Sequence, residues 1–127
     1  MNIEKVIFSF FIVLALTLNF GFFLGEIDNP DHHNVYELFA TIVVNLIATV
    51  FKFGERTQMG AVLLATSLVA DLELIAAALV WTLAVHVTGA GLTGPTMVVI
   101  VSLAGGALLA NAISVLLLVV EISLLRR

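Results

Sequence analysis

Long apolar segments alternate with short polar ones along the whole chain. Four of them are long enough to be membrane-spanning helices, at about residues 6–24, 36–53, 59–87 and 95–125. A spanning helix needs roughly 20 residues, within a range of about 17–25, so the second segment is close to the lower limit. The third and fourth are long enough to tilt strongly or to extend beyond the bilayer. The pattern predicts four transmembrane helices.

The connections between these segments are short and carry turn-forming residues. The first contains Asn29-Pro30, the second opens with Gly54, and the third, residues 88–94, reads "TGAGLTG". Short connections join antiparallel neighbours. We therefore expect a single all-α domain over residues 1–127, in which the four helices form an up-down bundle.

Composition indicates that lipid is the main solvent of this chain. Of its 127 residues, 61% are hydrophobic and only 11% are charged, and the mean hydropathy is +1.19. Soluble domains have about a quarter of their residues charged. We therefore expect an integral membrane protein whose partner is the lipid bilayer, and no binding of nucleic acid. The lack of cysteine excludes disulfides, thiolate metal sites and haem attached through cysteine. No catalytic constellation is visible, so we expect neither an enzyme nor a cofactor.

The first apolar segment has two interpretations. Lys5 followed by an apolar run resembles a secretory signal peptide. The run is longer than the usual apolar part of such a signal, however, and its end, "FGFFLG", lacks a small-x-small cleavage site. We interpret it as an uncleaved first membrane helix. Because it has few polar residues, we expect it to face mainly lipid.

The positions of the basic residues predict the orientation in the membrane. They lie at the two ends of the chain and around the second connection, at Lys5, Lys52, Arg56, Arg126 and Arg127. The first and third connections have no lysine or arginine. Positive residues accumulate on the cytoplasmic side. Both termini are therefore predicted to be cytoplasmic, in the inner (cytoplasmic) membrane.

The opposite side of the membrane is predicted to be acidic. Glu37 lies near the start of the second segment, and the loop before that segment forms what we call the outer acidic mouth, which consists of Glu26, Asp28, Asp31, His32 and His33. Such a surface concentrates cations and repels anions, and its histidines could make it sensitive to pH. The same loop could hold a metal ion through Asp28, Asp31, His32 and His33. We favour a solvated acidic loop.

Four polar residues fall at one predicted depth, near the middle of the membrane. Glu73 is the midpoint of the third segment, with Asp71 beside it, and Asn45 and Asn111 lie near the midpoints of the second and fourth. No lysine or arginine lies at this depth. Carboxyl groups in such a place are expected to be protonated, to sit in a wet cavity or to bind cations. The alternative is that neutral acids and amides only hold helices together by hydrogen bonds.

The two acids are expected to have different neighbours. Two residues on a helix are separated by roughly 200°. Asp71 belongs to a polar stripe, whereas Glu73 belongs to a stripe of alanines that suits close helix contact. Gly105 and Gly106 of the fourth segment also permit close approach of another helix. We expect Asp71 to face a wet path and Glu73 to face a packed interface or to relay protons.

The second segment carries a polar stripe along its whole length, formed by Glu37, Thr41, Asn45, Thr49 and Lys52. Its spacing keeps one helix face throughout. This stripe favours selective cation permeation, by a channel or a proton-coupled conductor. The expected pathway consists of Glu37, Thr41, Asn45, Thr49, Asp71, Glu73 and Asn111.

Four helices are too few to enclose a wide path. We therefore expect inorganic cations to pass on the axis of a homo-oligomer. The rival interpretation is a non-conducting membrane subunit or assembly factor that packs against partner helices.

Overall fold

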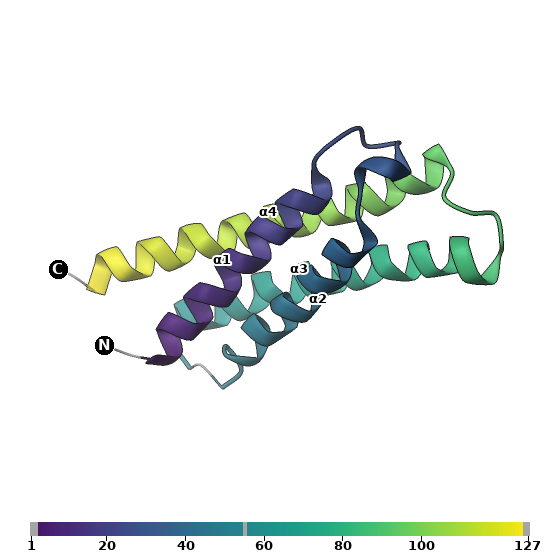
Figure 1. The fold of residues 1–127 in the computed structure, drawn as a ribbon. Coiled ribbons are helices and arrows are strands. Elements are labelled where there is room, and N and C mark those ends of the chain that lie inside the picture. The colour runs from purple at the N-terminus through teal and green to yellow at the C-terminus, as the bar shows by residue number, and fades with distance from the viewer. Residues whose placement is uncertain (1–2, 55, 126–127) are drawn as a thin grey trace.

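A computed structural model describes residues 3–54 and 56–125 of the protein and contains four α-helices (Figure 1). They are α1 (Ile3–Phe23), α2 (Val35–Val50), α3 (Gln58–Thr82) and α4 (Gly94–Leu125). A short 3-10 helix, η1 (Pro30–His32), lies between α1 and α2, and a π-helical turn, η2 (Leu83–Val87), continues α3. Arg126 and Arg127, on which the predicted orientation partly rests, lie outside the described residues.

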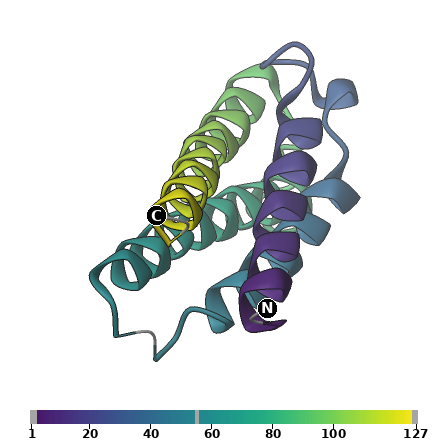
Figure 2. The same cartoon turned by 90° about the vertical axis from the view of Figure 1, so that its left-hand side faces the viewer.

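The helices form an up-down bundle in which each one packs against the next in the chain and α4 packs back against α1. The start of α1 and the end of α4 lie at the same end of the bundle, together with the α2–α3 connection (Figures 1 and 2). We call this the terminal end. The α1–α2 and α3–α4 connections lie at the other end, which we call the loop end. The prediction of an all-helical bundle is confirmed.

Three of the helical segments are long and apolar enough to cross a membrane, namely Ile3–Phe23, Gln58–Val87 and Gly94–Leu124. Large apolar side chains cover the outside of the bundle, with Leu72 71% and Leu109 68% exposed. Such a surface suits lipid and not water. The helix α2 is apolar but has only 16 residues.

The helix α2 ends earlier than the pattern predicts, at Val50 instead of at residue 53. The chain tightens there, because the N–H of Lys52 donates to the Thr49 oxygen and that of Phe53 to the Val50 oxygen, each three residues back. Gly54 then adopts a positive φ of 84°, a conformation that glycine takes at no steric cost. The apolar run therefore continues past the end of the helix into this turn.

The core has two parts. The larger one lies toward the loop end and includes Phe22, Leu38, Leu74, Met97 and Ile100. The smaller one lies toward the terminal end and consists of the buried residues Phe8, Ile12, Ala48, Leu63 and Leu118. Polar side chains are buried at the level between them, which is where the sequence predicts the middle of the membrane.

The helix α1, which is expected to face mainly lipid, also contributes a stripe of residues to both parts of the core. Its buried residues are Phe8, Ile12, Ala15, Asn19 and Phe22. Their spacing of three and four residues defines one continuous stripe along the helix. The large apolar residues on the rest of α1 hide this stripe in the sequence, because they make the whole segment apolar.

Candidate functional site

A belt of polar side chains crosses the middle of the bundle, and every helix contributes to it. The polar belt, as we call it, consists of Asn19 from α1, Asn45 from α2, Asp71 and Glu73 from α3, and Asn111 from α4. Four of these residues were predicted from the sequence. All except Glu73 are buried, with exposed fractions of 0–5%.

Asp71 connects α3 to α2 through both of its carboxyl oxygens. Asn45 Nδ2 donates to Asp71 Oδ1 at 2.6 Å, and Thr49 Oγ1 lies 2.6 Å from Asp71 Oδ2. Asn45 Nδ2 also lies 3.4 Å from the backbone oxygen of Ser67, one turn earlier on α3. Asp71 therefore holds the short α2 in register against α3, on the polar face predicted for it.

Asn19 connects α1 to the backbone of α4. With its amide oriented so that both polar atoms are satisfied, its Nδ2 donates to the Ala104 oxygen at 3.0 Å, and its Oδ1 accepts from the Leu108 N–H at 3.1 Å. The same Oδ1 lies 3.3 Å from Asn111 Nδ2. The sequence interpretation missed Asn19, because the apolar residues around α1 hide the buried stripe to which Asn19 belongs.

Glu73 lies on the opposite side of α3 from Asp71 and packs against α4. A Cβ atom added to Gly106 would overlap Glu73 Oε2, so the carboxyl group rests directly on the glycine backbone. A Cβ atom at Gly105 would instead meet the ring of Phe23 of α1, 2.9 Å away. The predictions that the two acids have different neighbours, and that both glycines mark close helix approaches, are confirmed.

One further contact links α3 and α4 on the terminal side of the polar belt. The hydroxyl oxygens of Thr66 and Ser114 are 2.6 Å apart. Ser114 Oγ also lies 3.2 Å from the Ala110 oxygen, which its hydroxyl can donate to. Polar contacts therefore join α3 to α4 as well as to α2.

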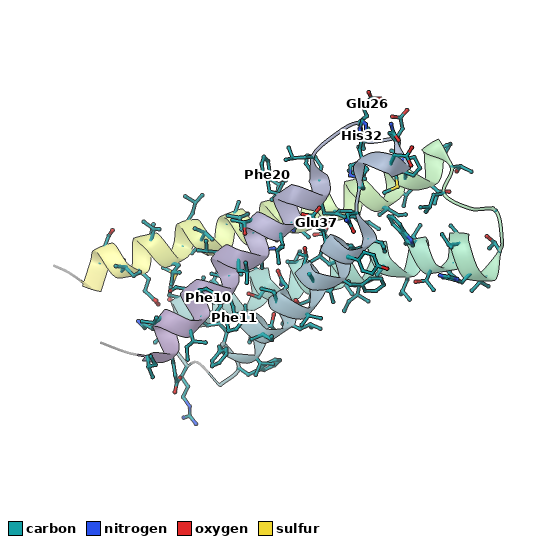
Figure 3. All side chains as sticks on the ribbon, in the orientation of Figure 1. Phe10, Phe11, Phe20, Glu26, His32 and Glu37 are labelled. Carbon is teal, nitrogen blue, oxygen red and sulfur yellow. The ribbon has the colours of Figure 1, made fainter. Side chains whose placement is uncertain are left out.

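The polar stripe of α2 lies inside the bundle of a single chain. Thr41 is buried and donates to the Glu37 oxygen at 2.6 Å, and Lys52 is 2% exposed, with its Nζ 4.3 Å from the centre of the Phe8 ring. Glu37 is half-buried and rests against Gly21 of α1. It lies closer to the middle of the bundle than Glu26 and His32 do (Figure 3).

At the loop end, His33 is buried and binds two backbone carbonyl groups. Its Nδ1 lies 2.6 Å from the Phe22 oxygen and its Nε2 lies 2.8 Å from the Glu26 oxygen. Carbonyl oxygens only accept hydrogen bonds, so a ring nitrogen of His33 contributes to either contact as an N–H donor. Phe22 is in the last turn of α1. His33 therefore supplies a cap to carbonyl groups at that helix end.

His32 points elsewhere, as expected for adjacent residues. It is exposed, and its Nδ1 accepts from the Glu26 N–H at 2.8 Å. Glu26, Asp28 and Asp31 are exposed too. Of the five residues predicted to form the outer acidic mouth, four therefore lie on the surface, whereas His33 is part of the interior.

No group of three or more His, Cys, Asp or Glu side chains in the described ranges, 3–54 and 56–125, is arranged to hold a metal ion. In particular, the two histidines of the loop are turned to different backbone partners. The alternative of a metal site at Asp28, Asp31, His32 and His33 is therefore not supported by this arrangement.

Residues 32–122 match the model of a protein family described as a family of unknown function, DUF6394. The match includes Asn45, Asp71, Glu73 and Asn111 but begins after Asn19. No curated protein and no solved structure matches the chain. Because the matched residues make up well over half of the sequence, the chain belongs to the DUF6394 family.

Proposed function

We propose that the protein crosses the inner (cytoplasmic) membrane four times and carries cations across it, with the polar belt as the central part of the pathway. The observation that carries this proposal is the convergence of polar groups from all four helices at one level, inside an otherwise apolar bundle. Buried polar groups in a membrane are expensive and commonly mark ion or proton paths.

The stripe on α2 provides a path from the belt toward both ends of the bundle. Glu37 and Thr41 lie between the belt and the loop end, and Thr49 and Lys52 lie between the belt and the terminal end. With the termini in the cytoplasm, the exposed acids Glu26, Asp28 and Asp31 lie on the outer face and attract cations. This arrangement favours cations over anions.

Close packing favours a proton-coupled conductor over a wide channel. Thr41 and Asn45 are 0% exposed, and Thr49 is 3% exposed, so the bundle leaves little room for a hydrated ion beside them. A proton needs only a series of hydrogen-bonding groups. Three buried oxygens, Asn45 Oδ1, Ser67 Oγ and Asn111 Oδ1, have no hydrogen-bond partner within the described chain and remain available to a proton or a cation.

The proposed homo-oligomer takes a different role from the one expected from the sequence. The stripe of α2 packs within the chain's own bundle, so a shared axis is not needed to cover it. Association of copies would instead use the outer surfaces of the helices, among which the α3–α4 seam contains the half-buried Glu73.

A second candidate function is that of a non-conducting membrane subunit. The observation in its favour is that much of the belt is satisfied internally: Asp71 by Asn45 and Thr49, and Asn19 by the backbone of α4. Interhelical hydrogen bonds whose only role is to stabilise a bundle produce the same pattern. Such a protein would pack against a partner and carry no ion.

Transport by purified protein in lipid vesicles distinguishes the two functions. Imposed gradients of H⁺, Na⁺, K⁺ and Ca²⁺ would be followed with ion-sensitive dyes, beside protein-free vesicles. We expect flux with the native chain and loss of flux when both belt acids are replaced, in the Asp71→Asn, Glu73→Gln double variant. The matched control is Ser102→Ala, which changes an exposed polar residue on α4. Absence of flux for all four ions overturns the proposal and favours the subunit.

A further inference from the structure

Glu73 differs from every other residue of the polar belt because its side chain has no polar partner among residues 3–54 and 56–125. No hydrogen bond or ion pair joins its carboxyl group to any part of the described chain, whereas both carboxyl oxygens of Asp71 are engaged. Its Oε2 lies against the backbone of Gly106. The side chain is also half-buried, so part of it faces outward from the α3–α4 seam.

The described residues of α3 and α4, the two helices that form the seam around Glu73, include no lysine or arginine. Besides Glu73, the ionisable residues of α3 and α4 are Asp71, on the opposite side of α3, and Glu121. Glu121 lies toward the terminal end and pairs with Lys5 of α1, at 3.4 Å. On α2, the ionisable side chains are those of Tyr36 and Glu37, at its loop end. An unpaired carboxylate in hydrocarbon is costly, and the neutral acid avoids that cost.

We propose that Glu73 is a membrane-embedded proton-binding site, which takes up and releases a proton at the α3–α4 seam, while Asp71 holds α2 and α3 together. This inference deepens the proposed function and rests on it for the transport step. It names the proton as the cation and Glu73 as the group that carries it. Of the two roles that the sequence suggested for Glu73 it keeps the relay of protons, and it gives Asp71 a structural role in place of a wet path.

Gly106 gives this site the space that it needs. Any larger residue at that position would occupy the place of the Glu73 carboxyl oxygen. The neighbouring Gly105 faces Phe23 of α1 instead. The pair Gly106→Ala and Gly105→Ala therefore makes a matched test, because both add one methyl group to the same turn of α4 but only the first displaces Glu73.

A hydrophobic carbodiimide tests the assignment chemically. Dicyclohexylcarbodiimide partitions into lipid and reacts with the neutral carboxylic acid: the acid proton goes to a carbodiimide nitrogen and the carboxyl oxygen bonds to the central carbon. Transfer of the acyl group to nitrogen then gives a stable N-acylurea, and nothing leaves. The reagent would be applied to the full chain in phosphatidylcholine vesicles, and the modified residue identified by peptide mass spectrometry.

We expect the modification on Glu73, with its extent falling as pH rises because the ionised carboxylate reacts poorly. It should be lost in Glu73→Gln, persist in Asp71→Asn, and be reduced in Gly106→Ala relative to Gly105→Ala. Modification of Asp71 in place of Glu73, or no modification of the folded native chain, overturns the proposal. Both of these contradicting outcomes are measured on the native chain, so they do not depend on whether a variant folds.

Transport measurements on the same vesicles separate this inference from the proposed function. We expect proton flux to be lost in Glu73→Gln and after carbodiimide treatment, and to persist in Ser102→Ala, which changes an exposed residue of α4 outside the polar belt. If Glu73 is modified but the native chain conducts no ion, the proton-binding site stands and the proposed transport function fails. If the native chain conducts protons and Glu73→Gln conducts equally, Glu73 is not the carrier.

Discussion

Asn45 donates a hydrogen bond to Asp71 across the interface of α2 and α3, with Nδ2 and Oδ1 2.6 Å apart. The contact joins the shortest helix of the bundle to one of the longest, and both residues are almost fully buried. Because α2 has only 16 residues with which to pack, a directional bond at its middle fixes its position along α3. Loss of this hydrogen bond should therefore lower the stability of the whole bundle.

Asn45→Ala should therefore destabilise the protein. The substitution leaves Asp71 Oδ1 buried without its donor, which costs about 1–3 kcal/mol. Unfolding by a denaturing detergent, followed by circular dichroism in lipid–detergent micelles, measures the difference. Ser102→Ala, at an exposed position of α4, should have little effect. Equal stability of the two variants would mean that the Asn45–Asp71 contact does not support the fold.

Asn19→Ala should also destabilise the bundle, by loosening α1 from α4. Thr17→Ala is the matched control, because Thr17 is exposed on the same helix and bonds only to its own backbone, at Leu14. We expect a loss of about 1–2 kcal/mol for Asn19→Ala, in the range of interhelical hydrogen bonds in membranes. The same unfolding assay applies. A larger loss for Thr17→Ala would contradict the contact described for Asn19.

Gly106→Leu should disrupt the contact between α3 and α4 through steric overlap with Glu73. The expected result is a lower melting temperature or a changed oligomer size, measured by light scattering in detergent. Ser102→Leu, also on α4 but at an exposed position, should be tolerated because it adds an apolar group to an apolar outer surface. If Gly106→Leu keeps the size and melting temperature of the native chain, α3 and α4 do not approach closely there.

His33→Ala should loosen the loop between α1 and α2, whereas His32→Ala should have a smaller effect. His33 is buried and binds the oxygens of both Phe22 and Glu26, so its loss removes a contact to the last turn of α1 and one to the loop that follows it. We expect faster amide hydrogen exchange in residues 22–34 for His33→Ala, measured by mass spectrometry. Equal exchange in the two variants would show that the buried ring does not hold the loop.

The predicted orientation can be tested with single cysteines, since the chain has none of its own. Ala90 and Gln58 are exposed and lie at opposite ends of the bundle. Ala90→Cys should react with a membrane-impermeant maleimide in intact cells, and Gln58→Cys should react only after the cells are permeabilised. The reverse pattern would place both termini outside the cytoplasm.

Much of the fold could be predicted from the sequence because lipid imposes a simple rule. A helix must satisfy its own backbone groups, so apolar length and short polar connections largely determine where helices begin and end. The deviations are local. The end of α2 at Val50 depends on a turn, and the π-helical Leu83–Val87 lies inside an uninterrupted apolar run that contains no signal for it.

The level of the candidate site along the bundle could be predicted from the sequence, but the partners of its side chains could not. The level of Asn45, Asp71, Glu73 and Asn111 follows from helix midpoints, and the separation of Asp71 from Glu73 follows from helix geometry. Which acid has partners depends on the rotation of α3 against both neighbours, and one sequence does not determine it. Asn19 was overlooked because a single amide among phenylalanines has little effect on the hydropathy of a segment. His33 was misplaced because loop geometry sets where its ring points.

The unequal lengths of the helices have a consequence for the surrounding lipid. At roughly 1.5 Å per residue, the 16 residues of α2 span about 24 Å, whereas the 32 residues of α4 span about 48 Å. The hydrocarbon layer is about 30 Å thick, so acyl chains beside α2 would have to shorten while those beside α4 would not. The lipid layer around the protein would then be thinner beside α2 than beside α4, and lipids with shorter chains should collect along the α2 side.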